Sequence, residues 1–551
     1  MAGSAERIYN FCKRQPIPCK CFNTCPANPT LTQIPILNTR VEDYLILNNA
    51  NSDAPFSVCN YGNAFTGSET FAGKGHGRVN TLVNKNMYFR YASMTKFMGM
   101  VVLGAALEDG YISSLDDPIA NYIDEFNGNG TYINPTSVTY TGNFDSYGSP
   151  TYTFDTIDFS LNTITIRHLI NGTAGFGYSF LGTGTLRSIL NELPNPSSNT
   201  LCNRNTFIAW LQYIENNHQI GKADLLDSFY SNPNDNSFKE TVTELLLNRI
   251  TKIPFLFKPG TQTIYDICTT VMGSVVGGAL QKKGIQKTST QYFQSRILSP
   301  LGITSIWFNC GSSQPPSNAK SNITDAYFVR NNTYFKSLDP LNPALNPIIN
   351  TTGTGINVNT NTLYRCFDAS ANGDGFTNQA NNTYFQNPTR EDVLAGGYDW
   401  SGCGTIPDLC KLLKMLIKKG KNQQNQQVLK AQTVEWILTP KTSQPMWLFG
   451  DDTANFMYSS AAWCGGFAKF MSNSLTLPFP CGPNTYYWQC YWGMHYYFDT
   501  DTGNYMVSGT QTPACTWYIQ EPNITTYPYG IIHNPPYEPN DITLWKLTTT
   551  Q

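Results

Sequence analysis

The most informative segment of this chain is Phe89-Arg90-Tyr91-Ala92-Ser93-Met94-Thr95-Lys96. Because an α-helix turns once in about 3.6 residues, Ser93 and Lys96 are predicted to lie on one face of a helix, with the hydroxyl near the amine. A serine hydroxyl is a weak nucleophile, but a neutral amine beside it can accept its proton. The pattern therefore indicates a candidate nucleophile and its base.

An almost uninterrupted apolar run follows this motif, from Phe97 to Leu107. Since a helix that is apolar all round is buried, we expect a buried helix from Ser93 to Glu108, ended by Asp109-Gly110. Most Ser-x-x-Lys matches in arbitrary sequences are solvated helix starts. A lysine beside a buried first turn is costly unless it has a partner or a role, and burial favours loss of its proton. This position favours the catalytic interpretation.

Composition limits the classes of partner. The chain has 551 residues and a net charge of -2, and only 13% of its residues are charged. Without clustered Lys and Arg, we expect no nucleic-acid partner. No apolar run reaches the roughly 18 residues of a membrane span, and the N-terminus lacks the apolar segment of a signal peptide.

The number and spacing of the cysteines indicate an oxidising environment. Four of the 15 cysteines crowd into one short segment, namely Cys12, Cys19, Cys21 and Cys25. The Cys19-Lys20-Cys21 spacing is too close for a usual zinc knuckle and no His lies nearby, so disulfides are the favoured interpretation. Several Asn-x-Thr triplets would suit a glycosylated exterior, although chance matches are the alternative in so Asn-rich a chain. These features favour an oxidising or particle-associated location, extracellular or in a virion, over the cytoplasm.

The chain is predicted to have one large catalytic domain, residues 36–515, with insertions near 127–162, 182–251 and 311–390. A Cys- and Pro-rich arm (1–35) precedes it and a surface tail (516–551) follows it. Within the domain, patterns predict a hairpin over 56–68 that turns at Gly62 and Gly67, a helix over 406–419, and strands over 488–499 and 504–509.

The octapeptide resembles the nucleophile motif of the serine β-lactamase, penicillin-binding protein and related esterase superfamily. Further similar segments follow in the family's order: 115–122, 164–170, 258–261 with Tyr265, 298–303, 395–398 and 405–409. They extend over most of residues 40–515. The resemblance implies an α/β fold of the β-lactamase/transpeptidase type. Such a fold has a mainly antiparallel central sheet flanked by helices, a helical subdomain, and the active site between them.

The resemblance also implies roles for particular residues. Ser93 would be the acylated nucleophile, Lys96 its base, and Tyr265 the group that relays a proton to the leaving group. A buried core tyrosine is the alternative for Tyr265. The next residues, Asp266 and Ile267, depart from the Tyr-Ser-Asn form of the penicillin-recognising members.

The third motif is the most altered. Trp488-Gln489-Cys490 stands where esterase-like members show Trp-Gly-Gly and lactamases show Lys-Thr-Gly, so no cation is there to hold a β-lactam carboxylate. By the resemblance, the amides of Ser93 and Tyr491 would form the oxyanion hole. His168 and His495 lie outside the motifs and are not expected to act as bases.

These motifs predict a hydrolase that forms an acyl-enzyme on a small-molecule or peptide substrate. A carboxylic ester is the first substrate class, and a β-lactam or D-Ala peptide is the second. No metal or organic cofactor is expected. The alternative is a catalytically degenerate structural protein on the same fold, which self-assembles through its long neutral insertions and Cys-rich arm.

Overall fold

The computed structural model describes residues 56–78, 81–145, 149–177, 203–218, 250–308, 316–324, 326–330, 356–358, 361–367, 398, 402–442, 461–470, 483–490 and 493–511. The predicted arm, the predicted tail and most of 182–251 and 311–390 lie outside these residues, and the domain boundaries stay predictions. In the part of the chain that is described, no helix has the length and apolar character needed to cross a membrane.

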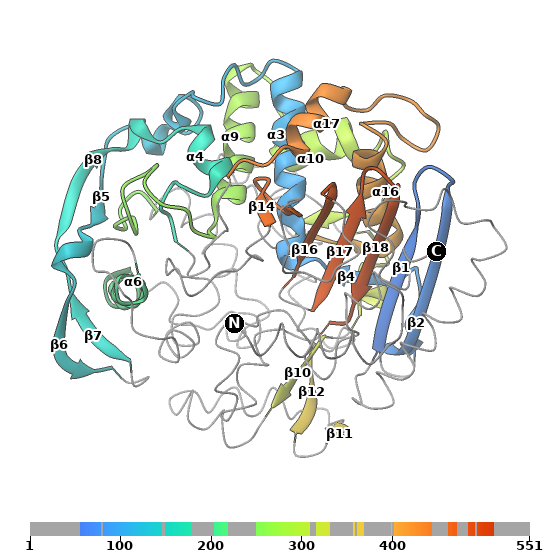
Figure 1. Cartoon of the computed structure of the whole chain (residues 1–551), viewed down its shortest axis with the longest axis horizontal. Helices are drawn as coiled ribbons and strands as arrows, with labels where there is room; N and C mark the ends of the chain where they lie inside the picture. Colours follow the sequence, from blue (N-terminus) through green and yellow to red (C-terminus); the bar gives the residue numbers. More distant parts are fainter. Residues whose placement is uncertain are drawn as a thin grey trace.

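An eight-stranded sheet is the largest sheet among the described residues, and every neighbouring pair in it is antiparallel. Figure 1 shows its strands beside the central helices. Its order is β14-β15-β16-β17-β18-β1-β2-β3. The strands are β1 (Phe56–Asn63), β2 (Ser68–Arg78), β3 (Thr81–Leu82), β14 (Ala461–Trp463), β15 (Ala468–Phe470), β16 (Thr485–Gln489), β17 (Met494–Asp499) and β18 (Asn504–Gly509). The expected mainly antiparallel sheet is confirmed.

One predicted strand and one predicted turn differ from the structure. The prediction of one strand over 488–499 is wrong, because β16 ends at Gln489 and a turn precedes β17. Gly493 adopts φ +71° in that turn, a conformation that favours glycine. The first hairpin turns at residues 64–67, whereas Gly62 lies inside β1. A Cβ on Gly62 would lie 2.0 Å from the Ser68 carbonyl oxygen, so this glycine permits close approach of strands rather than a turn.

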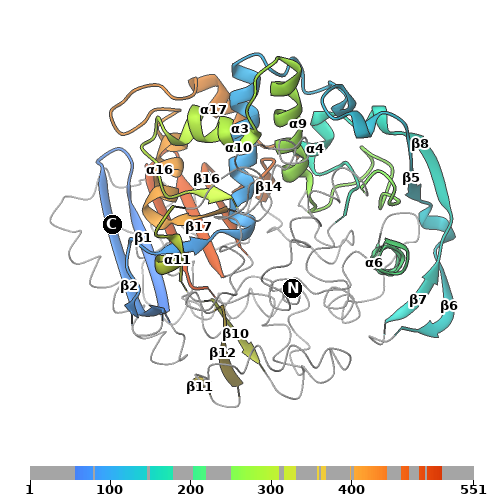
Figure 2. The ribbon, with the colours of Figure 1, turned by 180° about the vertical axis from the view of Figure 1, so that it is seen from behind.

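Helices α3 (Lys96–Glu108) and α16 (Ile406–Ile417) cover the same face of the sheet. Cross-strand pairing places Asn60, Val507 and Tyr496 on one face. Phe97 of α3 packs edge-on against Tyr496, with ring centroids 5.3 Å apart, and Asn60 Nδ2 donates to Cys410 Sγ of α16 at 3.1 Å. Figures 1 and 2 show α3 between this sheet and α9 (Cys268–Lys282).

The predicted buried helix is confirmed, although it begins with a 3₁₀ turn, η2 (Ala92–Thr95), before α3. Eleven residues of α3, from Lys96 to Ala106, are buried, as expected for a helix without a polar face. Helices α9, α10 (Ser289–Phe293) and α17 (Ala431–Leu438) pack against it. The helix expected over 406–419 is α16, which ends two residues earlier.

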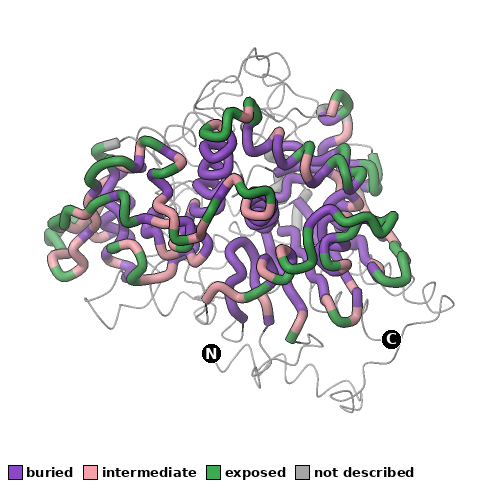
Figure 3. Tube along the Cα trace, turned by 90° about the horizontal axis from the view of Figure 1, so that it is seen from above, coloured by how far each residue is buried: buried purple, intermediate pink, exposed green. Residues whose placement is uncertain are grey.

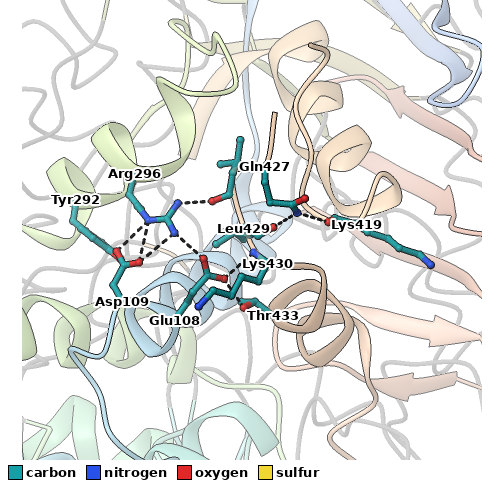
Figure 4. A network of polar contacts seen from close by, with 10 residues as sticks. Glu108, Asp109, Tyr292, Arg296, Lys419, Gln427, Leu429, Lys430 and Thr433 are labelled. Atoms are coloured by element: carbon teal, nitrogen blue, oxygen red, sulfur yellow. Dashed lines mark hydrogen bonds and ion pairs between the residues drawn. The ribbon is translucent and has the colours of Figure 1, made fainter. Parts of the chain in front are cut away.

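A polar network fixes the C-terminal end of α3 (Figure 4). Glu108 Oε1 accepts from Arg296 Nη2 at 2.9 Å, and Arg296 Nε also contacts Asp109 Oδ2 at 3.1 Å. Glu108 Oε2 accepts from Lys430 N at 2.8 Å and from Thr433 Oγ1 at 2.5 Å. Because these partners come from η8 (Gln294–Leu298) and the start of α17, the network ties three helical segments together.

The remaining elements surround this core. Segments within residues 129–145 and 149–160 form two small sheets at one extremity, next to helix α6 (Arg204–His218; Figure 1). In Figure 3 the buried residues concentrate in the interior and the exposed residues on outer loops. These elements are β4 (Tyr88–Arg90), β5 (Asn129–Ile133), β6 (Thr139–Phe144), β7 (Pro150–Thr153), β8 (Thr156–Ser160), α4 (Ile166–Asn171), α6 (Arg204–His218), β9 (Trp307–Phe308), α11 (Ala319–Asn322), β10 (Ala326–Arg330), β11 (Ile356–Val358), β12 (Asn361–Phe367) and β13 (Gly402–Thr405). Short 3₁₀ turns lie at Ile119–Asn121, Asp124–Phe126, Pro135–Ser137 and Leu161–Thr163.

Candidate active site

Ser93 lies in the 3₁₀ turn between β4 and α3, and strand β13 forms hydrogen bonds with the residues on both sides of Ser93. Tyr91 N donates to the Gly402 carbonyl of β13 at 2.8 Å, and Gly402 N donates to Thr95 Oγ1 at 3.2 Å. A Cβ on Gly402 would lie 2.7 Å from Thr95 Oγ1, so only glycine fits this approach without a shift. Between these contacts Ala92 has φ +40°, a strained conformation for a non-glycine residue.

Lys96 is the first residue of α3 and is only 1% exposed. Its Nζ donates to the Asp266 carbonyl at 3.0 Å and to Thr269 Oγ1 at 3.4 Å. Within the described part of the chain, no hydrogen bond joins Ser93 Oγ to this amine. Ser93 and Lys96 lie one helical turn apart, as the motif predicts. The Lys96 amine, however, contacts residues that lie 170 or more positions away in the sequence.

Tyr265 lies directly over this lysine, in the loop that precedes α9. The Lys96 Nζ is 4.5 Å from the Tyr265 ring centroid. Trp488 and Trp463 enclose the same ring, with centroids 5.7 Å and 6.1 Å from it and 4.9 Å from each other. The structure thus brings together the motif lysine, Tyr265 and Trp488, three groups that the sequence indicated separately, and it adds Trp463.

The hairpin of β14 and β15 supports the start of α3. A Cβ on Gly466, in the turn of this hairpin, would lie 2.5 Å from the Lys96 carbonyl oxygen and 2.9 Å from Phe97 N. Gly465 adopts φ +93° and packs against Met100. Backbone of the hairpin therefore touches backbone of the helix start, a contact that a larger side chain would prevent.

The third motif lies at the end of β16, where Cys490 follows the last residue of the strand. Cys490 N donates to the Met494 carbonyl at 2.8 Å, so this amide is engaged within the turn. Its Sγ accepts from Met494 N at 3.3 Å. Because side chains alternate along a strand, Gln489 points to the face opposite Trp488 and is removed from Tyr265. Tyr491, the expected second oxyanion donor, lies outside the described residues.

The two histidines are held in structural positions. His168 Nδ1 accepts from Thr165 N at 3.1 Å and caps α4, and its partial burial lowers its pKa. His495 is buried in β17, next to Tyr496 and therefore on the other face of the sheet.

Three contacts of this site could not be predicted from the sequence. Thr269 follows Tyr265 by four residues, which is the spacing of one helical turn, but nothing local indicates that it reaches Lys96. Trp463 belongs to a short segment without a motif. Asp266 was recognised as a departure from the family pattern, although its carbonyl contact with Lys96 was not foreseen.

Comparisons with known proteins bear on the family and the fold. A family model described as Beta-lactamase matches residues 61–513. No curated protein matches the sequence significantly. Among solved structures, simvastatin synthase (LovD) from Aspergillus terreus has a TM-score of 0.52 as its selenomethionyl derivative, with 15% identity over 87% of this chain and 95% of that chain. A family VIII carboxylesterase has a TM-score of 0.47, with 13% identity over 87% of this chain and 92% of that chain. At such identities the likeness shows the fold alone.

Proposed function

This chain belongs to the β-lactamase family, and on that premise we propose that it is a serine hydrolase that forms an acyl-enzyme on Ser93. The observation that carries the proposal is the contact between Lys96 and Tyr265, with Nζ 4.5 Å from the ring. A buried amine and a buried phenol meet one helical turn from a serine that directly follows the strained Ala92. Two proton-transfer groups beside a nucleophile are what acyl transfer requires.

The proposed reaction has two stages. Ser93 Oγ attacks the carbonyl carbon of the substrate while Lys96 accepts the hydroxyl proton, and a tetrahedral intermediate forms. The C–O bond to the leaving group then breaks, and Tyr265 supplies a proton to the leaving oxygen. In the second stage water attacks the acyl carbon and gives a proton to the Tyr265 phenolate. The C–O bond to Ser93 then breaks, Lys96 returns its proton to Ser93 Oγ, and the acid is released. The Ser93 and Tyr491 amides remain the proposed oxyanion donors.

A carboxylic ester is the proposed substrate class. Trp488 stands where the penicillin-recognising members carry a lysine, so this position offers an aromatic face rather than a cation. A β-lactam carboxylate would lack its usual partner there. Tyr265, Trp463 and Trp488 form a buried aromatic cluster beside Lys96, and such apolar surroundings favour an apolar acyl or alcohol group.

Labelling with a fluorophosphonate, together with turnover of a p-nitrophenyl ester and of a chromogenic β-lactam, tests the proposal. We expect labelling and ester turnover that fall at least about 1,000-fold in Ser93→Ala. Ser274→Ala is the matched control, because it removes a buried hydroxyl that bonds the Thr270 carbonyl within α9.

Three results would contradict the proposal. Equal labelling of the wild type and Ser93→Ala would show that another residue reacts. Faster turnover of the β-lactam than of the ester would overturn the substrate class. Absence of both labelling and turnover would favour the degenerate structural protein, whose self-assembly could then be measured by sedimentation.

A further inference from the structure

Gln511 holds the backbone of Arg90 through both ends of its side-chain amide. Its Oε1 accepts from Arg90 N at 2.9 Å, and its Nε2 donates to the Arg90 carbonyl at 3.2 Å. Gln511 is fully buried and follows the end of β18 by two residues. An amide that accepts and donates in this way replaces the two hydrogen bonds that a neighbouring strand would give to one residue.

The position of Arg90 places these contacts next to the candidate site. Arg90 is the last residue of β4, and Ser93 follows it by three residues. Strand β13 binds one edge of this segment, where Tyr91 N donates to the Gly402 carbonyl at 2.8 Å. Because the backbone groups of successive strand residues point to opposite edges, the N–H and the carbonyl of Arg90 point away from β13 and toward Gln511. The segment that leads to Ser93 is therefore held on both edges.

This hold on both edges gives a reason why Ala92 keeps its strained conformation. Ala92 has φ +40° and lies between Arg90 and Ser93 in the chain, two residues after the Gln511 contacts. A strained backbone persists only where its surroundings over-determine it. Without the Gln511 amide, the backbone of Arg90, which is 5% exposed, would lose two hydrogen bonds in a buried position. The strained turn would then be free to relax.

The segment that carries Gln511 also touches the turn after the third motif. Thr510 N donates to the Gly493 carbonyl at 3.2 Å, and a Cβ on Gly509 would lie 2.2 Å from the same carbonyl oxygen. Gly493 lies in the turn between β16 and β17. This short segment therefore contacts both that turn and β4. The two parts belong to different sheets, because β4 pairs with β13 in a three-stranded sheet and β16 to β18 lie in the eight-stranded one.

We propose that Gln511 is a positioning residue that sets the strand before Ser93 against the turn after the third motif. The inference rests on the proposed acyl-enzyme chemistry, in which the amides of Ser93 and Tyr491 bind the oxyanion. Ser93 follows Arg90 by three residues, and Tyr491 precedes Gly493 by two. Gln511 acts only through backbone and does not touch the substrate. Because an oxyanion hole depends on the placement of both donors, loss of the Gln511 contacts slows the reaction without weakening binding.

The test follows the rate of Ser93 labelling at increasing concentrations of a fluorophosphonate. Such a series separates the limiting rate constant of labelling from the half-saturating concentration of the reagent. Gln511→Met removes both hydrogen bonds, whereas Gln511→Glu keeps the acceptor for Arg90 N and loses the donor to its carbonyl. In both folded variants we expect the limiting rate constant to fall at least about 10-fold, with a half-saturating concentration within about two-fold of the wild type.

Gln212→Met is the matched control. Gln212 of α6 is also buried (6% exposed), its Oε1 accepts from Tyr152 N at 3.3 Å, and its Nε2 donates to the Pro150 carbonyl at 3.0 Å. This glutamine therefore binds backbone in the same manner, but it does so at the extremity that carries β6 and β7 (Figure 1). Its removal is expected to leave the limiting rate constant of the folded protein unchanged.

Three results would overturn the inference. They are a wild-type limiting rate constant in folded Gln511→Met or Gln511→Glu, a change confined to the half-saturating concentration, and an equal fall of the limiting rate constant in Gln212→Met. If wild-type Ser93 is not labelled at any concentration, the proposed function itself is refuted. Labelling of the wild type with an unchanged limiting rate constant in the Gln511 variants refutes only the role of Gln511.

Discussion

Ala92→Gly tests whether backbone strain positions the nucleophile. Ala92 has φ +40° and is 6% exposed, directly before Ser93. A non-glycine residue in the left-handed region costs about 1–2 kcal/mol, which glycine would recover. Glycine in turn loses about 0.5–1 kcal/mol through the entropy of the unfolded chain. Removal of the buried methyl group costs about 0.8 kcal/mol more.

These opposing terms nearly cancel, so we expect the free energy of unfolding to stay within about 1 kcal/mol of the wild type. The rate of Ser93 labelling should nevertheless fall about 10-fold, because a freer φ lets the hydroxyl leave its productive geometry. Urea unfolding measures the first quantity and fluorophosphonate labelling the second.

Ala106→Gly is the control for this substitution. Ala106 is fully buried in the last turn of α3, where an alanine is unstrained. Glycine relieves no backbone strain at this position, so we expect the free energy of unfolding to fall by about 1.5 kcal/mol. The rate of Ser93 labelling should stay unchanged for the folded fraction. The reasoning is refuted if Ala92→Gly is as destabilising as Ala106→Gly, or if it is labelled at the wild-type rate.

Arg296→Met should destabilise the protein by about 2 kcal/mol, because it leaves the Glu108 carboxylate, whose side chain is 8% exposed, without its ionic partner. The stability of Arg296→Lys should lie between that of the wild type and that of Arg296→Met. A wild-type urea midpoint for Arg296→Met would contradict this prediction. Burial lowers the pKa of Lys441 to about 8, below its value in the unfolded chain. The unfolded state therefore binds more protons between about pH 8 and pH 10.5, so the contribution of Lys441 to stability should rise over this window and be smallest below pH 8. The difference in unfolding free energy between the wild type and Lys441→Met measures this contribution, and a difference that does not vary with pH would refute it. Gly466→Ala should lower both the stability of the protein and the rate of Ser93 labelling, since the new Cβ would lie 2.5 Å from the Lys96 carbonyl oxygen. Gly278→Ala should lower the stability alone, since its Cβ would lie 2.0 Å from the Tyr122 carbonyl oxygen. Equal labelling rates for the folded fractions of these two glycine variants would exclude the hairpin as a support of the site.

Much of the fold was predictable because its signals are local. The apolar run after Lys96 has no polar face, and it forms the buried helix α3 with the expected end at Glu108. The strand over 488–499 was predicted wrongly because its apolar and aromatic pattern continues through Gly493, while the backbone turns there. Pattern alone does not show where a chain stops pairing and reverses.

The motif of Ser93 and Lys96, the ordered family segments and the buried helix can be predicted from the amino-acid sequence, since all of these depend on the order and spacing of nearby residues. The surroundings of the lysine, in contrast, depend on tertiary packing. The Asp266 carbonyl, the Thr269 hydroxyl and the Tyr265 ring reach Lys96 because α9 packs beside α3. Such contacts join segments about 170 residues apart, and they depend on how helices and sheet pack rather than on any local pattern.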